Sequence, residues 1–264
     1  MTNHNLNVCL FPMELIWDDV EANLENLKKS LEKLHPLTDI LILPETFTTG
    51  FPTNAEKNSV SNLVEPSQQY VISTIKELAA KYNIAIAGSI IVKDEDSLCN
   101  RAFFIEPSGD EYYADKRHLF TMAGEDKVFS SGVRRMKVRF RGWNIAMVVC
   151  YDIRFPVWCR NVGNEYDLLI VIANWPSVRI GAWEKLLPAR AIENLSYLAA
   201  VNCRGEDKNG FNYNGSSGIF DFKGDSIGVT SPPFVYAKLD YQKLDRFRQK
   251  FPAWKDADPF SLSY

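Results

Sequence analysis

Uninterrupted apolar runs alternate along this chain with segments in which apolar residues recur at helical spacing. Such runs indicate strands that are buried on both faces, and the helical spacing indicates helices that lie against a sheet. The pattern predicts strands over residues 6–10, 39–43, 84–92, 100–105, 111–116, 136–140, 143–150, 168–173 and 197–202. It predicts helices over residues 18–34, 67–82, 156–162, 182–194 and 241–250. Strands and helices that follow one another in this way are typical of an α/β protein.

Polar stretches separate these elements. We expect loops over residues 46–66, 117–132 and 205–218, with two further strands after the last loop. Neither a repeat nor a low-complexity linker divides the chain, so we expect residues 1–264 to form one domain. The C-terminal tail, about residues 240–264, is rich in aromatic side chains, and we expect it to dock on a surface or on a partner.

The charged residues are nearly balanced, with 30 Lys and Arg against 33 Asp and Glu and a formal net charge of −3. No basic stripe is visible, so we expect neither a nucleic acid nor an anionic membrane as a partner. The five cysteines are odd in number and irregular in spacing, which predicts reduced thiols in the cytoplasm. The chain has only three histidines, which argues against a site with several histidine ligands, and we expect no metal or cofactor.

Cys150 lies where an apolar run changes into the signals of a turn and a helix start, Asp152, Arg154 and Pro156. A side chain at that junction is presented at the carboxyl end of a sheet, where α/β proteins bind ligands. Backbone N–H groups at a helix start favour the thiolate, which is the nucleophilic form of cysteine. The alternative is a buried structural cysteine, and position alone gives the two readings equal weight.

Two other predicted strands also end in a chemically useful residue, Glu45 after residues 39–43 and Lys116 at the end of residues 111–116. Each alone is more often a solvated surface charge. Together with Cys150 they complete one reaction, since a cysteine that attacks an amide needs a proton acceptor and a cation for the oxyanion. The set therefore predicts hydrolysis of a carbon–nitrogen bond by a thiol.

Three segments resemble, in order, the signature segments of the nitrilase, or carbon–nitrogen hydrolase, superfamily. They are residues 44–47 (Pro-Glu-Thr-Phe), 115–120 (Asp-Lys-Arg-His-Leu-Phe) and 150–156 (Cys-Tyr-Asp-Ile-Arg-Phe-Pro). The resemblance implies a four-layer α-β-β-α sandwich. It implies that Glu45 is the general base, Lys116 the oxyanion and positioning cation, and Cys150 the nucleophile. Glu125 matches a second, auxiliary glutamate of that family.

Further segments resemble the bacterial omega-amidases of this superfamily, which act on 2-oxo acid amides such as 2-oxoglutaramate. They are residues 174–176, 187–194, 202–205 and 251–258. This resemblance implies hydrolysis of the terminal amide of 2-oxoglutaramate or 2-oxosuccinamate through a cysteine thioester. In one respect the chain departs from the family pattern, because Cys203 stands between Asn202 and the arginine that commonly follows it.

Several residues near the predicted strand ends are candidates for binding substrate. The backbone N–H of Tyr151 could hold the oxyanion, and Asn174 and Trp175 could line the pocket. Arg154 and Arg179 could bind a substrate carboxylate. Structural alternatives are an ion pair between Arg154 and Asp152 or another acid, an aromatic lid formed by Trp175, and a solvated Arg179. We expect His118 to be a solvated loop residue.

Other functions use the same residues differently. A nitrilase or an N-carbamoyl hydrolase would employ the same Glu-Lys-Cys set on another bond. A Cys–His acyltransferase would use His118 as its base, and a catalytically dead scaffold would use none of them. The resemblance, together with the apolar segment of residues 186–198, implies a homodimer or a larger symmetric assembly.

Overall fold

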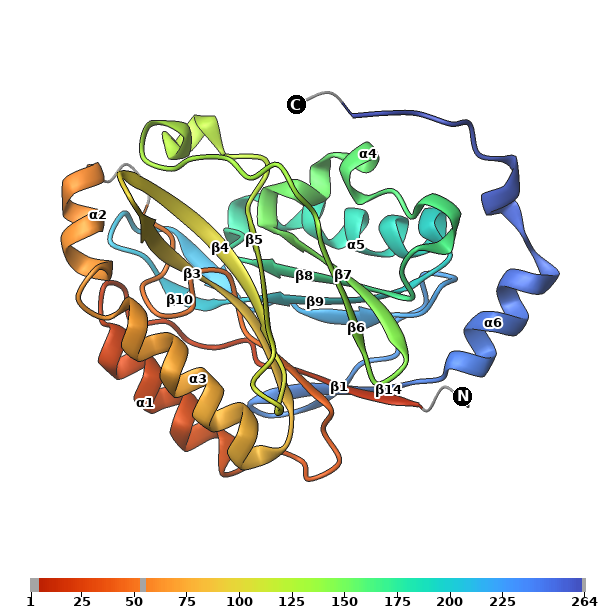
Figure 1. Ribbon diagram of the computed structural model, residues 1–264, viewed down its shortest axis with the longest axis horizontal. Coiled ribbons are helices and arrows are strands. Elements are labelled where there is room, and N and C mark those ends of the chain that lie inside the picture. Colours follow the sequence, from red (N-terminus) through yellow and green to blue (C-terminus); the bar gives the residue numbers. More distant parts are fainter. Residues whose placement is uncertain (1–4, 53–55, 263–264) are drawn as a thin grey trace.

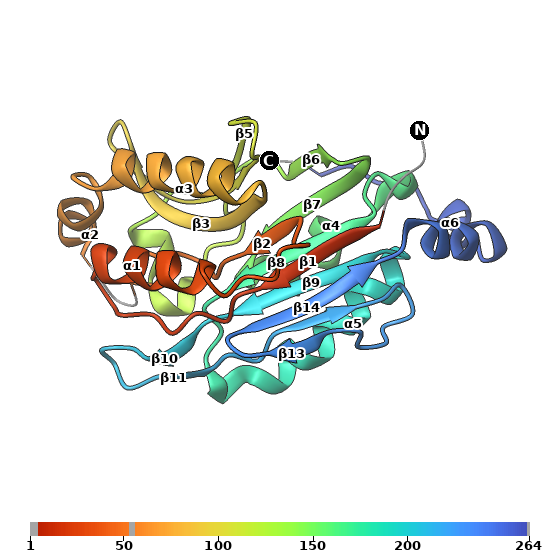
Figure 2. The same ribbon diagram turned by 90° about the horizontal axis from the view of Figure 1, so that it is seen from below.

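Two β-sheets stack face to face between layers of helices in the computed structural model, which describes residues 5–52 and 56–262 (Figures 1 and 2). The first sheet has seven strands in the order β13-β14-β1-β2-β3-β4-β5. Its strands are β1 (Leu6–Leu10), β2 (Ile40–Ile42), β3 (Ala85–Asp94), β4 (Ser97–Ile105), β5 (Glu111–Asp115), β13 (Val229–Ser231) and β14 (Phe234–Leu239). Strands β1, β2 and β3 run parallel, and the others pair antiparallel.

The second sheet has five strands in the order β12-β9-β8-β7-β6, again with a parallel centre. Its strands are β6 (Met136–Phe140), β7 (Trp143–Val149), β8 (Leu168–Ala173), β9 (Tyr197–Asn202) and β12 (Gly218–Phe220). A separate hairpin pairs β10 (Arg204–Glu206) with β11 (Asn212–Asn214). The apolar residues between the two sheets form one cluster, to which Ile42 and Phe104 contribute from one side and Val138 and Ile145 from the other.

Helices cover the outer face of each sheet, which confirms the expected α-β-β-α arrangement (Figure 2). Helices α1 (Val20–Leu31) and α3 (Gln68–Tyr82) pack on the first sheet, with α2 (Lys57–Val64) at its end. Helices α4 (Pro156–Cys159) and α5 (Ile180–Asn194) lie on the second, and α6 (Tyr241–Lys250) lies at the rim.

Helix α1 shows how the sequence pattern produces this layer. Asp19 caps the helix, because its side chain accepts a hydrogen bond of 2.9 Å from the backbone N–H of Ala22. Leu24, Leu27 and Leu31 recur on one face and are buried against the sheet. Burying each of these side chains contributes about 1.5–3 kcal/mol, which is more than the helix's own propensity supplies.

Some sequence-based expectations were wrong in detail. The expected loop of residues 46–66 contains α2, whose only buried residues are Val60 and Val64, too sparse an apolar pattern to stand out. Residues 53–55 of that loop lie outside the described residues. The expected loop of residues 205–218 contains the hairpin β10–β11, and three strands follow it where two were expected. The helix expected over residues 156–162 is only the single turn of α4.

The tail after α6 runs back along the molecule toward α4 (Figure 1). Phe260 and Leu262 line a shallow hollow with Val157 and Val162 of the α4 region. The side chains of these residues nevertheless keep 40–56% of their surface exposed. None of the helices in residues 5–52 and 56–262 has both the length and the apolar character that crossing a bilayer requires.

Candidate active site

Four strands end at one pocket between the two sheets. Strand β2 leads to Glu45, β5 to Lys116, β7 to Cys150 and β8 to Asn174. The pocket has a volume of about 190 Å³, enough for a small organic molecule. Its lining residues are Glu45, Phe51, Lys116, Phe120, Met122, Ala123, Cys150, Tyr151, Arg154, Asn174, Trp175, Pro176, Arg179, Phe211 and Tyr213. The structure therefore brings Glu45, Lys116 and Cys150 together in one pocket, as we expected from the sequence.

The Glu45 carboxylate is fully buried and receives several hydrogen bonds. Its Oε1 accepts from Asn100 Nδ2 at 2.8 Å and from Lys116 Nζ at 2.9 Å. Its Oε2 accepts from the backbone N–H of Asn174 at 2.9 Å. These donors come from β4 and from the ends of β5 and β8, so they hold the carboxylate in one orientation toward the pocket.

Lys116 bridges two carboxylates. Its Nζ lies 2.9 Å from Glu45 Oε1, and 2.9 Å and 3.0 Å from the two carboxylate oxygens of Glu125. Burial by itself lowers the pKa of the Lys116 ammonium, but the charges of Glu125 and Glu45 outweigh it, and the pKa lies above its ordinary value. The lysine therefore stays positively charged and can stabilise an anion that forms in the pocket.

Glu125 begins a 3-10 turn, η2 (Glu125–Lys127), in the polar stretch after β5. Its Oε2 accepts a hydrogen bond of 2.5 Å from the backbone N–H of Phe120, which holds the loop against the pocket. Burial raises the pKa of the Glu125 carboxyl, although Lys116 opposes the shift. The structure thus places Glu125 beside Lys116, as the sequence resemblance implied.

Cys150 begins a 3-10 turn, η3 (Cys150–Arg154), with a backbone φ of +46°. That conformation is unfavourable for a residue with a Cβ, and such strain is often found where a nucleophile is presented. The Asp152 carboxylate holds the turn, because its Oδ2 accepts a hydrogen bond of 3.0 Å from Val149 N. The thiol lies near the Glu45 carboxyl, whose charge acts on it, and its Sγ donates to the Asn174 carbonyl oxygen at 4.0 Å.

The expectation that a helix start stabilises the Cys150 thiolate was wrong. Burial and then the Glu45 carboxylate raise the pKa of the Cys150 thiol well above its ordinary value, and Lys116 only partly offsets them. The turn that follows is a short 3-10 segment rather than an α-helix, so it brings no strong helix dipole. The resting cysteine is therefore a thiol, and its attack requires transfer of the proton to a base.

The expectation of a solvated His118 was also wrong. Both its backbone N and its Nδ1 lie within 2.9 Å of Asp152 Oδ1, and its ring stacks on Phe155 at 3.7 Å. Only 25% of the side chain is exposed. His118 is absent from the pocket lining, so the geometry gives no support to a Cys–His pair.

Two arginines line the pocket beside aromatic rings. The Arg154 guanidinium lies 4.8 Å from the centre of the Trp175 ring, and that of Arg179 lies 5.0 Å from the Phe120 ring. Within the described part of the chain, neither makes an ion pair with a carboxylate. The ion pair expected between Arg154 and Asp152 is therefore wrong, because Asp152 bonds to His118 and Val149 instead. Both guanidinium groups are available to an anionic ligand.

The remaining predicted pocket residues also lie in the lining. The side-chain amide of Asn174 donates to Glu45 O and Thr46 Oγ1, both at 2.9 Å, and so connects two strand ends. Trp175 is buried, and its Nε1 donates to Arg179 O at 2.9 Å. The Tyr151 ring packs against Phe120 at 5.0 Å.

Sequence reasoning missed several residues at this site, and three of them shape it most directly. Asn100, a buried residue of β4, donates to Glu45, and its polar side chain within an apolar strand was a usable signal. Phe211 and Tyr213 form a wall of the pocket from the hairpin β10–β11. No local pattern marks these two aromatic residues, because only the fold of the hairpin brings them to the pocket.

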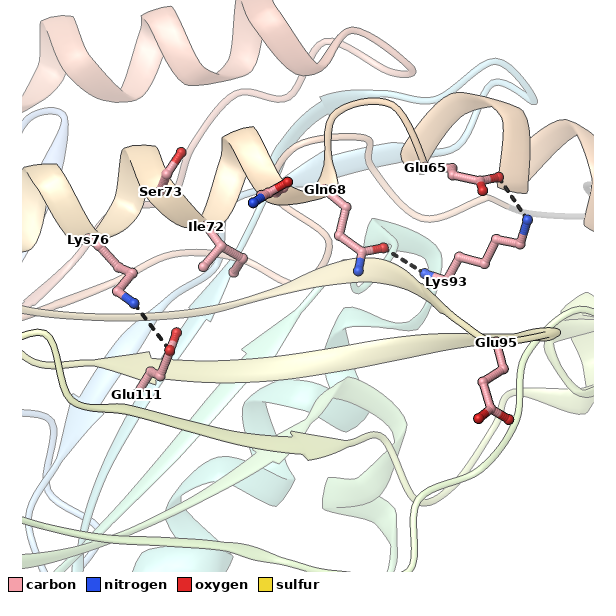
Figure 3. A pocket seen from close by; sticks show the side chains of 9 residues that line it. Glu65, Gln68, Ile72, Ser73, Lys76, Lys93, Glu95 and Glu111 are labelled. Carbon is pink, nitrogen blue, oxygen red and sulfur yellow. Dashed lines mark hydrogen bonds and ion pairs between the residues drawn. The ribbon is translucent and has the colours of Figure 1, made fainter.

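A second, larger hollow lies on the outer face between α3 and the edge of the first sheet (Figure 3). Its lysines already have partners, since Lys76 lies 3.1 Å from Glu111 and Lys93 lies 2.8 Å from Glu65. These ion pairs are exposed, and the lining contains no cysteine. We therefore place the chemistry in the pocket that contains Cys150. In residues 5–52 and 56–262, the His, Cys, Asp and Glu side chains form no group that could hold a metal ion.

Comparisons with known proteins agree with this geometry. A sequence model of the carbon–nitrogen hydrolase family matches residues 8–249. The chain is 40% identical to the omega-amidase YafV of Escherichia coli over 97% of this chain and 98% of that protein. It is 32% identical to the 2-oxoglutaramate amidase of Bacillus subtilis over 88% of this chain and 91% of that protein.

Among solved structures, XC1258 from Xanthomonas campestris superposes with a TM-score of 0.92 at 37% sequence identity. The match covers 98% of this chain and 100% of that one. That protein is described as a CN-hydrolase superfamily member with an arsenic adduct in its active site.

Proposed function

Because this chain belongs to the carbon–nitrogen hydrolase family, we propose that its pocket hydrolyses the terminal amide of short 2-oxo dicarboxylic acid monoamides, releasing ammonia. Such substrates include 2-oxoglutaramate and 2-oxosuccinamate. The similarity to the omega-amidase of Escherichia coli and to the 2-oxoglutaramate amidase of Bacillus subtilis supports this substrate class.

The observation that carries the proposal is the pair of arginines in the pocket of Glu45, Lys116 and Cys150. Among the described residues, the guanidinium groups of Arg154 and Arg179 have no carboxylate partner. A small anionic amide would place its carboxylate against this end of the pocket and its amide carbon against Cys150. A neutral amide would leave both cations without a counter-charge.

Acylation begins when the Cys150 sulfur attacks the amide carbon and the thiol proton passes to Glu45. The tetrahedral oxyanion is stabilised by the Lys116 charge and by the backbone N–H of Tyr151. Glu45 then gives its proton to the amide nitrogen, the C–N bond breaks, and ammonia leaves. The product on the protein is a thioester between Cys150 and the acyl group.

Deacylation uses the same groups in reverse order. Glu45 takes a proton from a water molecule, whose oxygen attacks the thioester carbon. The second oxyanion is stabilised as the first was, and it collapses with cleavage of the C–S bond. The proton returns from Glu45 to the sulfur, which releases the dicarboxylic acid and restores the Cys150 thiol. Glu125 contributes by holding Lys116 in place.

We also propose that the protein acts in the cytoplasm as a homodimer. The reduced state of the cysteines supports the compartment, since all five are free and buried. The exposed apolar side chains of Val157, Val162, Phe260 and Leu262 support an association between copies of the chain.

The test measures ammonia release from a panel of 2-oxo acid amides, glutamine, neutral amides of equal length, ureas and nitriles. We expect 2-oxo acid amides to have the highest kcat/KM. Equal or faster turnover of glutamine or of a neutral amide would contradict the substrate assignment, and turnover of a nitrile or N-carbamoyl compound alone would indicate the alternative chemistries. A protein that turns over none of them would be a scaffold.

Variants of the two arginines sharpen this test. Of Arg154→Ala and Arg179→Ala, one removes the cation that anchors the substrate carboxylate. We expect that variant to lose about 2–4 kcal/mol of transition-state stabilisation, measured from kcat/KM, on the anionic substrate and little on a neutral one. Arg246→Ala removes an exposed arginine of α6, outside both the pocket and the hollow at the tail, and serves as the matched control.

A further inference from the structure

The side chain of Asn100 occupies an unusual position for a polar group. It lies in β4 on the strand face of Leu98 and Ala102, is 1% exposed, and donates from Nδ2 to Glu45 Oε1 at 2.8 Å. Within the described residues, its Oδ1 is buried and has no hydrogen-bond partner. An unpaired buried acceptor is unfavourable for stability, so folding alone does not explain an amide at this position.

The acceptor sites of Glu45 are unevenly occupied. Each oxygen of a carboxylate offers about two acceptor sites. Both sites of Oε1 are filled, by Asn100 Nδ2 and by Lys116 Nζ at 2.9 Å. Among the described residues, Oε2 accepts one hydrogen bond, from the backbone N–H of Asn174 at 2.9 Å, which leaves one site for the proton of the Cys150 thiol.

We propose that Asn100 is a positioning residue for Glu45: with Lys116 it saturates Oε1, so that Oε2 alone receives the proton of Cys150. The proposal rests on the proposed amidase function, in which Glu45 is the base. The proton moves from Sγ to Oε2 as the S–C bond forms, and it leaves Oε2 for the amide nitrogen as the C–N bond breaks. Asn100 itself touches neither the substrate nor the reacting atoms.

The other charged or titratable groups around Glu45 cannot replace this amide. Lys116 already donates to Oε1, and Glu125 lies on the far side of that lysine. The thiol of Cys203 is buried near Glu45 but repels its charge when ionised. Asn100 is therefore the neutral donor that can fill the second site without adding a charge.

The test follows two rates against pH, alkylation of Cys150 by iodoacetamide and hydrolysis of a 2-oxo acid amide. The variants are Asn100→Asp and Asn100→Leu. Cys99→Ala serves as the control, because Cys99 is also buried in β4 but its side chain points to the opposite face of the strand. Alkylation needs no turnover, so it reports on Glu45 even if the substrate assignment is wrong.

We expect Asn100→Asp to lower kcat/KM near neutral pH by about 10- to 100-fold. The new carboxyl shares a proton with Glu45, so the acid limb of both profiles moves to higher pH by about one unit or more. Asn100→Leu, which removes the donor and the unpaired acceptor together, should lose about 10-fold, with a smaller shift in the same direction. Cys99→Ala should match the wild type in both profiles.

Acid limbs that do not move in folded Asn100→Asp and Asn100→Leu would overturn the proposal, even if both rates fall, because a merely structural residue changes rates without changing the base. If Asn100→Asp does not fold, the shift in Asn100→Leu alone decides. A shifted alkylation limb in a protein that hydrolyses no amide would support the role of Asn100 and overturn the proposed substrate.

Discussion

Glu45 is the residue on which the proposed chemistry depends, because it accepts hydrogen bonds from Asn100, Lys116 and Asn174 and lies near the Cys150 thiol. At the level of single residues, the site therefore combines a base, Glu45, with a protonated nucleophile, Cys150. The positive charge of Lys116 lies beside them.

Cys150→Ala should abolish amide hydrolysis and leave the fold intact, since the side chain is small and an alanine fills most of its space. Cys150→Ser should be nearly inactive, because a hydroxyl is far harder to ionise than a thiol. Ammonia release and circular dichroism measure the two effects. Substantial turnover by the alanine variant with an unchanged spectrum would contradict the role of Cys150 as nucleophile.

The pH dependence of Cys150 alkylation should change when its base is removed. In the wild type the thiol can pass its proton to Glu45, so alkylation does not require the thiol to ionise alone. In Glu45→Gln the thiol must ionise alone, and burial, the largest cause of its raised pKa, remains, so alkylation should require alkaline pH. Rapid alkylation of Glu45→Gln at pH 7 would show instead that Cys150 is already a thiolate.

At the element scale, the hairpin β10–β11 supplies the wall of the pocket that faces the substrate. Asp207 holds its tip, because Oδ1 accepts from the backbone N–H groups of Asn209 and Phe211 at 2.8 Å and 2.9 Å. Its Oδ2 accepts from the Tyr213 hydroxyl at 3.1 Å. The Tyr213 ring in turn stacks on Trp17 at 5.2 Å, which fixes the wall to the first sheet's side of the molecule.

Asp207→Ala should loosen this wall without touching the reacting groups. We expect KM for the best substrate to rise by about 10-fold with a much smaller change in kcat, since about two hydrogen bonds that orient Phe211 and Tyr213 are lost. Steady-state kinetics separate the two constants. Lys208→Ala, which removes an exposed side chain from the same hairpin, is the control. A fall in kcat with KM unchanged would argue against a role in shaping the pocket.

At the scale of the whole molecule, the tail and the α4 region leave apolar surface uncovered. Phe260 and Leu262 are 47% and 40% exposed, and Val157 and Val162 beside them are 47% and 56% exposed. A second copy of the chain packed here would bury this surface, as the proposed homodimer requires.

Light scattering at micromolar concentration should give the mass of a dimer or a larger assembly. Phe260→Asp combined with Leu262→Asp should weaken the association, because burying these charges without partners is costly. Leu37→Asp changes an exposed apolar residue, 67% exposed and outside this hollow, and should leave the mass unchanged. A monomer mass for the wild type would contradict the proposed assembly.

The central strands of both sheets and the residues at their ends could be predicted from the sequence alone. A buried parallel strand is a local apolar run, and the residue that follows it is delivered to the sheet edge wherever the strand lies, so Glu45, Lys116, Cys150 and Asn174 could all be assigned in advance. Most helices could be predicted in the same way. In α1, for example, Leu24, Leu27 and Leu31 repeat at helical spacing.

Which of these groups touch, and how they are charged, depends on the packing of the two sheets and could not be predicted from the sequence. Asn100 meets Glu45 across 55 residues of chain, and Asp152 binds His118 rather than Arg154. Contacts of this kind depend on how the strands align within a sheet and how the two sheets pack. Neither alignment produces a periodic pattern in the sequence. The pKa of Cys150 depends in the same way on burial and on the nearest carboxylate, and for that reason the expectation from its position in the chain had the wrong sign.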